Sequence, residues 1–127
     1  MTIKTEGQHT GEFLLTESRG EISRDNETIA VAASTLMKAG TVLGKRSSGG
    51  KLAEYDNDNT DGTETAVAIL WSEADNSAGV GEVDFARAVI NWGAEVRKAD
   101  LQWGTGVLTA EKTAAYLELE AKGIKAR

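Results

Sequence analysis

Short apolar runs alternate with polar, glycine-containing stretches along most of the chain. Residues 66–71 (AVAILW) are almost continuously apolar, which predicts a strand buried on both faces. Residues 82–90 (EVDFARAVI) alternate instead, with Val83 and Phe85 on one face of a predicted strand. Further strands are expected at residues 28–33 and 94–98, and polar loops at residues 18–27 and 73–81.

A hairpin is predicted near the middle of the sequence. Two β-type runs, residues 41–45 and 51–55, flank the turn cluster SSGG at residues 47–50. The dense Asn/Asp stretch at residues 56–62 follows and predicts a loop, because Asx side chains bond to nearby backbone groups.

The C-terminal region holds the clearest helical pattern. Thr109 is expected as the N-cap, and Gly123 as the residue just beyond the helix. Ile124 would then contact Leu119 in a hydrophobic stop. The apolar face is predicted to consist of Ala110, Ala114, Leu117 and Ala121.

The first 20 residues differ from the rest of the chain. They are mostly polar, so we expect residues 1–20 to form a flexible N-terminal arm. The arm contains an apolar run at residues 13–15, which fits either a strand or a docking peptide. The predicted fold is therefore mainly β (β-rich α+β): residues 21–127 form one compact domain of short strands with a C-terminal helix.

Composition excludes several classes of protein. The 127 residues include no cysteine, so disulfide scaffolds, Cys-rich zinc sites and thiol catalysis are excluded. A net charge of −6 without a basic run argues against general binding to nucleic acid or to an anionic membrane. No apolar run has the length of a membrane span, and residues 1–11 lack the apolar region of a secretory signal.

Candidate chemical sites are weak. Residues 57–62 (NDNTDG) begin like a calcium loop, but Ala68 stands where a bidentate Glu is needed, so a turn is favoured. The single histidine, His9, lies in the predicted arm without a rigid platform. A metal-assisted hydrolase would have to use the loop carboxylates Asp56, Asp58 and Asp61. We predict no catalytic, cofactor or metal site.

The tryptophans and the arm are more informative. Trp71 ends the most apolar strand and is expected in the core. Trp92 and Trp103 stand beside glycines at the ends of elements, where aromatic residues either cap a core or anchor an interface. An unfolded arm that carries a short strand-like run suits addition to the sheet edge of another protein.

In order and spacing, the sequence resembles the head decoration proteins of tailed bacteriophages, of the lambda type. The resemblance covers roughly residues 11–127. It is carried by residues 11–17, 39–45, 55–56, 61–62, 66–70, 94–96 and 122–124, together with Leu101 and Trp103. Gly104 departs from the pattern, because a proline is expected after Trp103.

The resemblance implies a structural virion protein on the outer surface of the capsid. Members of this family bind as homotrimers to the major capsid protein at local three-fold sites of the expanded head and stabilise it against the pressure of packaged DNA. They are not enzymes and need no cofactor, and neither nucleic acid nor membrane is a direct partner. The capsid contact carries over to Glu12, Phe13, Leu14 and Leu15.

Another binding function stays open beside this interpretation. A β-rich phage module could recognise a host-surface or glycan ligand, with Trp92 and Trp103 as its platform. The same two tryptophans are the candidates for an interface between subunits.

Overall fold

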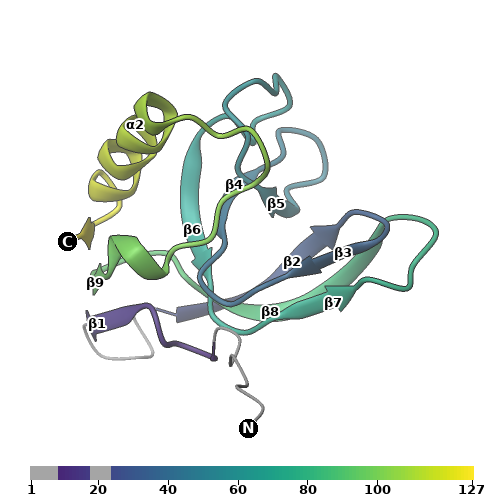
Figure 1. Cartoon of the computed structure of the whole chain (residues 1–127), viewed down its shortest axis with the longest axis horizontal. Coiled ribbons are helices and arrows are strands. Elements are labelled where there is room, and N and C mark those ends of the chain that lie inside the picture. Colours follow the sequence, from purple (N-terminus) through teal and green to yellow (C-terminus); the bar gives the residue numbers. More distant parts are fainter. Residues whose placement is uncertain (1–8, 18–23) are drawn as a thin grey trace, which may run out of the picture.

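A closed five-stranded barrel organises the fold. The computed structural model describes residues 9–17 and 24–127 (Figure 1). Around the barrel, the strands follow the order β2 (Arg24–Val31), β5 (Leu52–Glu54), β4 (Val42–Lys45), β6 (Ala66–Leu70) and β8 (Val83–Ile90). The strands predicted at residues 66–71 and 82–90 are confirmed, and their buried side chains, including Ala68, Leu70 and Val89, belong to an aliphatic core cluster.

The predicted hairpin is confirmed as β4 and β5, which pair antiparallel with Lys45 opposite Leu52. The polar loop predicted at residues 18–27 is wrong for residues 24–27; residues 18–23 lie outside the described part. β2 begins at Arg24 and pairs with all of β8, from Arg24 opposite Ile90 to Val31 opposite Val83. Residues 24–27 are polar and were therefore predicted as a loop, but pairing with β8 makes them part of a strand.

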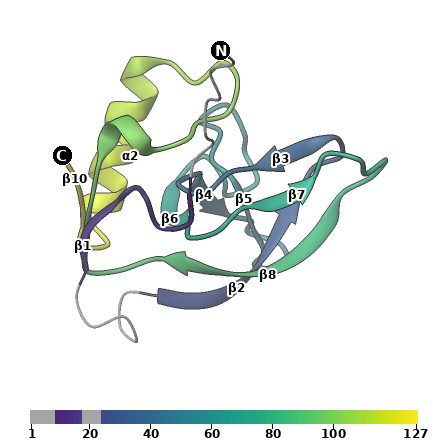
Figure 2. The same cartoon turned by 60° about the horizontal axis from the view of Figure 1, so that its bottom comes forward.

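A second layer lies beside the barrel. It is a three-stranded sheet in the order β1 (Leu14–Glu17), β9 (Ala94–Val96) and β10 (Ile124–Ala126). The helix α2 (Thr109–Glu120) and a short 3₁₀ turn, η1 (Lys98–Asp100), complete this side of the molecule (Figures 1 and 2). Val96, Leu119 and Ile124 are fully buried here and belong to one core cluster with the barrel residue Ile90.

The opposite end of the molecule holds a small sheet that the sequence did not predict. β3 (Thr35–Met37) pairs antiparallel with β7 (Ala74–Asn76). The polar loop predicted at residues 73–81 is therefore wrong over β7. The physical reason is the buried Asn76, whose side-chain amide donates to the carbonyls of Val31, Ala32 and Gly81 at 3.0–3.1 Å.

The C-terminal helix is confirmed, but its predicted N-cap and apolar face are wrong. The N-cap is Leu108 and not Thr109. The backbone N–H of Leu108 donates a hydrogen bond to the Glu111 carboxylate at 3.1 Å. The buried helix residues are Ala115 and Leu119, whereas Leu117 is 65% exposed. Alanines lie on several faces of this helix, so the alanine pattern alone does not define a buried face. Packing against β6 and β10 determines which face is buried.

The helix ends as predicted. Gly123 follows it with φ +79°, and Ile124 and Leu119 are both fully buried in the same core cluster. The expectation of a mainly β domain with a C-terminal helix is thus confirmed. Within residues 9–17 and 24–127, no helix combines the length and apolar character needed to cross a membrane.

Candidate functional site

The described part of the predicted arm is built into the domain. Phe13 is fully buried, and its ring makes an edge-on contact with Trp71 at a centroid distance of 6.1 Å and an interplanar angle of 78°. Its carbonyl accepts a hydrogen bond from the Arg97 N–H at 2.8 Å, and β1 continues into antiparallel pairing with β9. Residues 1–8 and 18–20 of the predicted arm lie outside the described residues.

In this placement, Phe13 lies in the core and β1 is paired with β9. Burial of an aromatic ring and pairing with β9 outweigh the chain entropy lost on ordering the segment. The boundary at residue 20 remains a prediction. A capsid contact by the Phe13 side chain would require it to leave the core, whereas Glu12 and Leu15 are exposed where they stand.

Leu15 lies at an irregularity of β1. Leu14 pairs with Val96 and Thr16 with Glu95, so Leu15 is the extra residue of a bulge. Its side chain is 38% exposed, and Leu14 beside it packs partly against the core. Glu12 bonds locally, because its carboxylate accepts the His9 N–H at 2.8 Å. The segment therefore presents one apolar and one acidic side chain on the surface.

Trp71 contacts the N-terminal segment at Gly11 and Phe13. Gly11 adopts φ +67° and donates its N–H to the Trp71 carbonyl at 3.0 Å, and a Cβ at this position would collide with the Trp71 ring. The Arg24 guanidinium lies 3.7 Å from the centroid of that ring. The side chain of Trp71 is half-buried, and it contacts Phe13 of the N-terminal segment.

The two other tryptophans have different environments. Trp103 makes edge-on contacts with Tyr55 at 6.0 Å and Tyr116 at 5.6 Å, and packs against the core. Trp92 is 50% exposed at the end of β8. Among the described residues, no ring contact joins Trp92 to Trp103.

Gly104 allows a close approach behind Trp103. A Cβ at this position would collide with the carboxylate of Glu54. Burial raises the pKa of that carboxyl above its ordinary value, with a smaller contribution from the nearby Asp56.

The Asn/Asp loop is a series of turns. The Asp56 carboxylate accepts the Asp58 N–H at 3.0 Å, and the Asp61 carboxylate accepts the Thr63 N–H at 3.1 Å. Hydrogen bonds from the side chain and backbone of Thr63 lower the pKa of Asp61. Among the described residues, no three His, Cys, Asp or Glu side chains gather as a metal site.

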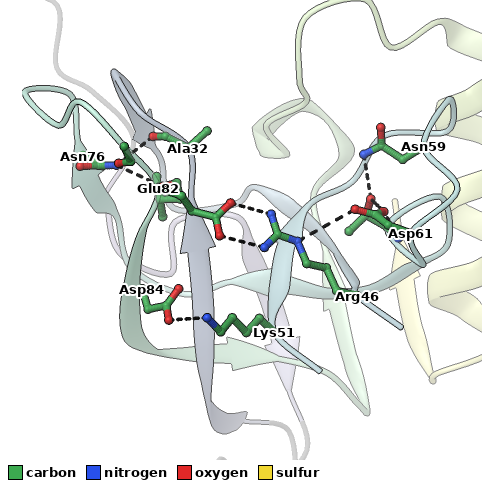
Figure 3. A network of polar contacts seen from close by, with 11 residues as sticks. Ala32, Arg46, Lys51, Asn59, Asp61, Asn76, Glu82 and Asp84 are labelled. Atoms are coloured by element: carbon green, nitrogen blue, oxygen red, sulfur yellow. Dashed lines mark hydrogen bonds and ion pairs between the residues drawn. The ribbon is translucent and has the colours of Figure 1, made fainter. Parts of the chain in front are cut away.

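A polar network joins the β4–β5 hairpin to the start of β8, and the sequence pattern gave no sign of it. Arg46 donates two hydrogen bonds to the Glu82 carboxylate, at 2.9 and 2.7 Å, and lies 4.0 Å from Asp61 (Figure 3). Lys51 pairs with Asp84 at 2.6 Å. Arg46 and Glu82, like Lys51 and Asp84, are more than 30 positions apart and meet only after the barrel closes, so local spacing could not reveal these two pairs.

Replacing Glu82 with glutamine tests this network through its pH dependence. The hydrogen bonds from Arg46 lower the pKa of Glu82, so its stabilisation is present above the carboxyl's unfolded pKa and is lost as the pH falls through the folded one. We expect Glu82→Gln to cost about 0.5–1 kcal/mol at pH 7, because both groups are partly exposed. Thermal unfolding at pH 7 and pH 3 measures the difference, which should shrink at pH 3.

The control for this measurement is Glu73→Gln. Glu73 is exposed and makes no side-chain ion pair within the described residues. It should leave the melting temperature almost unchanged at both pH values. An equal loss for the two variants at pH 7 would show that the pairing of Arg46 with Glu82 contributes nothing specific.

The described surface carries several singly exposed leucines and a half-exposed tryptophan. The family model described as Bacteriophage lambda head decoration protein D matches residues 3–124, and the chain belongs to this family. The match starts before residue 11, where the resemblance in the sequence began. A comparison with curated proteins finds no match.

Membership in this family makes the chain a structural protein of the phage head, associated with the capsid and located on the outside of the virion. The suspected family is thereby confirmed.

Proposed function

We propose that the chain binds as a homotrimer at local three-fold sites of the expanded capsid and stabilises the head against the pressure of packaged DNA. The observation that carries this proposal is the family match over residues 3–124. The major capsid protein is the partner, and neither nucleic acid nor membrane is bound directly. A net charge of −6 agrees with that exclusion.

A closed ring of three copies needs two different surfaces on each copy that fit one another. Trp92, half-exposed between β8 and β9, is our candidate for the contact between subunits. Three copies acting together would give avidity, so each capsid contact can be weak.

We further propose that Glu12, Leu14 and Leu15 contribute to the capsid contact, while Phe13 anchors their segment in the domain. The exposed Leu15 and Glu12 support this assignment, and the buried Phe13 fixes the position from which they project. We propose no catalytic role for the chain.

Heads of the parent phage that lack a decoration protein provide the test. Adding the chain should raise the temperature at which DNA-filled heads rupture, and cross-linking on the heads should yield trimers. Heads that bind the chain yet rupture at an unchanged temperature would contradict the stabilising role, and bound monomers would contradict the trimer.

The exposed side chain of Leu15 provides a site-specific prediction. Leu15→Asp should weaken binding to expanded heads by about tenfold, because an apolar contact is lost and a charge is desolvated. Leu36→Asp is the matched control, since Leu36 is 41% exposed against 38% for Leu15 and lies on β3 at the other end of the molecule. Equal binding by the two variants, measured by co-sedimentation, would remove Leu15 from the contact.

A further inference from the structure

The connection between β7 and β8 holds an apolar side chain in water. Val80 lies at its tip, and the side chain of Val80 is fully exposed. We call residues 77–82 the β7–β8 loop, and Figures 1 and 2 show it projecting from the molecule. A single exposed valine is ordinary on a protein surface, but this one lies on a loop that polar contacts hold in place.

Hydrogen bonds fix the β7–β8 loop at both ends. Just before it, the buried Asn76 amide donates to three backbone carbonyls, one of which belongs to Gly81 within the loop. At its last residue, the Glu82 carboxylate accepts two hydrogen bonds from Arg46 (Figure 3). The loop is therefore ordered before a partner arrives, and Val80 can enter a contact with little further loss of conformational entropy.

A hollow with an apolar floor opens in the barrel. All five barrel strands line it, through Glu27, Lys45, Leu52, Val67, Ala68 and Val89. We call this hollow the barrel mouth. Leu52, Ala68 and Val89 are buried members of the core cluster of the barrel, so the floor of the mouth is apolar.

The barrel mouth has the size of one side chain rather than of a small-molecule ligand. Its volume is about 160 Å³, whereas small-molecule sites usually measure about 300–1,000 Å³. Liquid water takes about 30 Å³ per molecule, so the mouth has room for the three carbons of an isopropyl group. Its volume and its apolar floor therefore suit a branched aliphatic side chain such as valine.

The charges around the loop and the mouth are opposite. Lys45 and Lys122 line the mouth and form no ion pair within the described part of the chain, and Glu27 is the single acid of the lining. Residues 74–84 contain three acids and no basic residue. Two of these acids are paired within the chain, and Asp75 has no ion-pair partner among the described residues. The remaining charges thus favour contact between the two surfaces.

One chain does not bring its own loop to its own barrel mouth. The loop precedes Val83 at the start of β8, whereas Val89 near the end of that strand lines the mouth. A strand rises about 3.3 Å per residue, so roughly 20 Å of β8 lies between them. Contact between the loop and the mouth therefore joins two copies through unlike surfaces, which is the arrangement that closes a ring. Trp92, our candidate for the subunit contact, directly follows Asn91 of the mouth lining.

We infer that the β7–β8 loop of one copy inserts Val80 into the barrel mouth of the next, and that this contact repeats around the three-fold axis. The inference rests on the proposed function, since it names the surfaces by which three copies hold one another. A second copy is the occupant because this chain carries both surfaces, and they match in size, polarity and charge.

Disulfide trapping tests the contact directly, because the chain has no cysteine of its own. A full chain with Val80→Cys and Val67→Cys carries one thiol on the loop and one in the wall of the mouth. Bound to expanded heads and oxidised, it should form covalent trimers that a reductant dissolves. The matched control combines Leu108→Cys with Val67→Cys, because Leu108 is 64% exposed but does not line the mouth. Its yield of trimers should be about tenfold lower, since its thiols are not held together.

Val80→Asp provides a second test without cysteines. It should keep the melting temperature of the wild type, because the exposed side chain contributes little to folding. On expanded heads, an amine-reactive cross-linker should give about tenfold fewer trimers of Val80→Asp than of the wild type. Leu108→Asp should cross-link like the wild type.

The outcomes separate this inference from the proposed function. Wild-type trimers on heads without disulfide trimers, and with full cross-linking of Val80→Asp, would overturn the inference and leave the proposed homotrimer intact. Weaker head binding by Val80→Asp with a wild-type share of trimers among the bound chains would also overturn it, by assigning the loop to the capsid. If the wild type gives only monomers on heads, the proposed homotrimer itself fails.

Discussion

Replacing Phe13 with alanine is expected to lower the free energy of unfolding by about 3–5 kcal/mol, the usual cost of truncating a fully buried aromatic side chain. Phe13 has no exposed surface, and its ring contacts Trp71 edge-on. Its loss opens a cavity where the N-terminal segment, the barrel and β9 meet. Circular dichroism should show a melting temperature lower by roughly 10 °C or more. Tryptophan fluorescence, to which Trp71 contributes with Trp92 and Trp103, should shift to longer wavelength because the Trp71 ring gains contact with water.

Leu15→Ala is the control, because Leu15 lies in the same segment with its side chain 38% exposed. It should cost less than about 1 kcal/mol. A melting temperature for Phe13→Ala equal to that of Leu15→Ala would mean that residues 9–17 do not belong to the cooperatively folded unit. The segment would then be an arm in the sense predicted from the sequence.

Replacing Gly44 with alanine is expected to have the second-largest effect, about 3 kcal/mol, at the upper end of the cost of overpacking. A Cβ at this position would lie 2.5 Å from the Cα and 2.7 Å from the carbonyl oxygen of Thr63. These are backbone atoms of the segment that leads from the Asn/Asp loop into β6, so no side-chain rotation can relieve the contact. Denaturant unfolding would measure the loss as a lower midpoint at an unchanged slope.

Gly81→Ala separates crowding from the general effect of losing a glycine. No atom lies within 4 Å of a Cβ built at Gly81, and its φ is not positive. This variant should be neutral or slightly stabilising, because alanine reduces the freedom of the unfolded chain. Similar destabilisation by both variants would refute the steric explanation for Gly44.

The elements that sequence patterns predicted well are those with strong local signals. β6 is almost continuously apolar, the β4–β5 hairpin has its glycine turn, and Gly123 ends α2 at a positive φ. In each case the determinant lies within a few residues of the element. The same local reasoning gave the mainly β class and the C-terminal helix.

The elements that it missed depend on distant partners. β7 contains the polar residues Asp75 and Asn76, whose local pattern predicts a loop. The strand forms because β7 pairs with β3 and because the Asn76 amide donates hydrogen bonds to the carbonyls of Val31 and Gly81. Strand β10 has three residues, and its extended conformation depends on parallel hydrogen-bonded pairing with β9. The helix face was wrong because alanine contributes little to hydrophobic periodicity, so tertiary contacts decide which side is buried.

The candidate site was predictable only in part. The run at residues 13–15 was singled out as apolar, but its pattern left a strand and a docking peptide equally open. The structure resolves this into a buried Phe13, a bulged Leu15 and a strand paired with β9.

Co-sedimentation of the full chain with expanded empty heads of the parent phage tests the central claim most directly. Unexpanded heads serve as the matched control, because the proposed sites belong to the expanded shell. The account predicts that the chain pellets with expanded heads up to a saturating amount and stays in the supernatant with unexpanded ones. A chain that remains in the supernatant with both kinds of head would contradict the account.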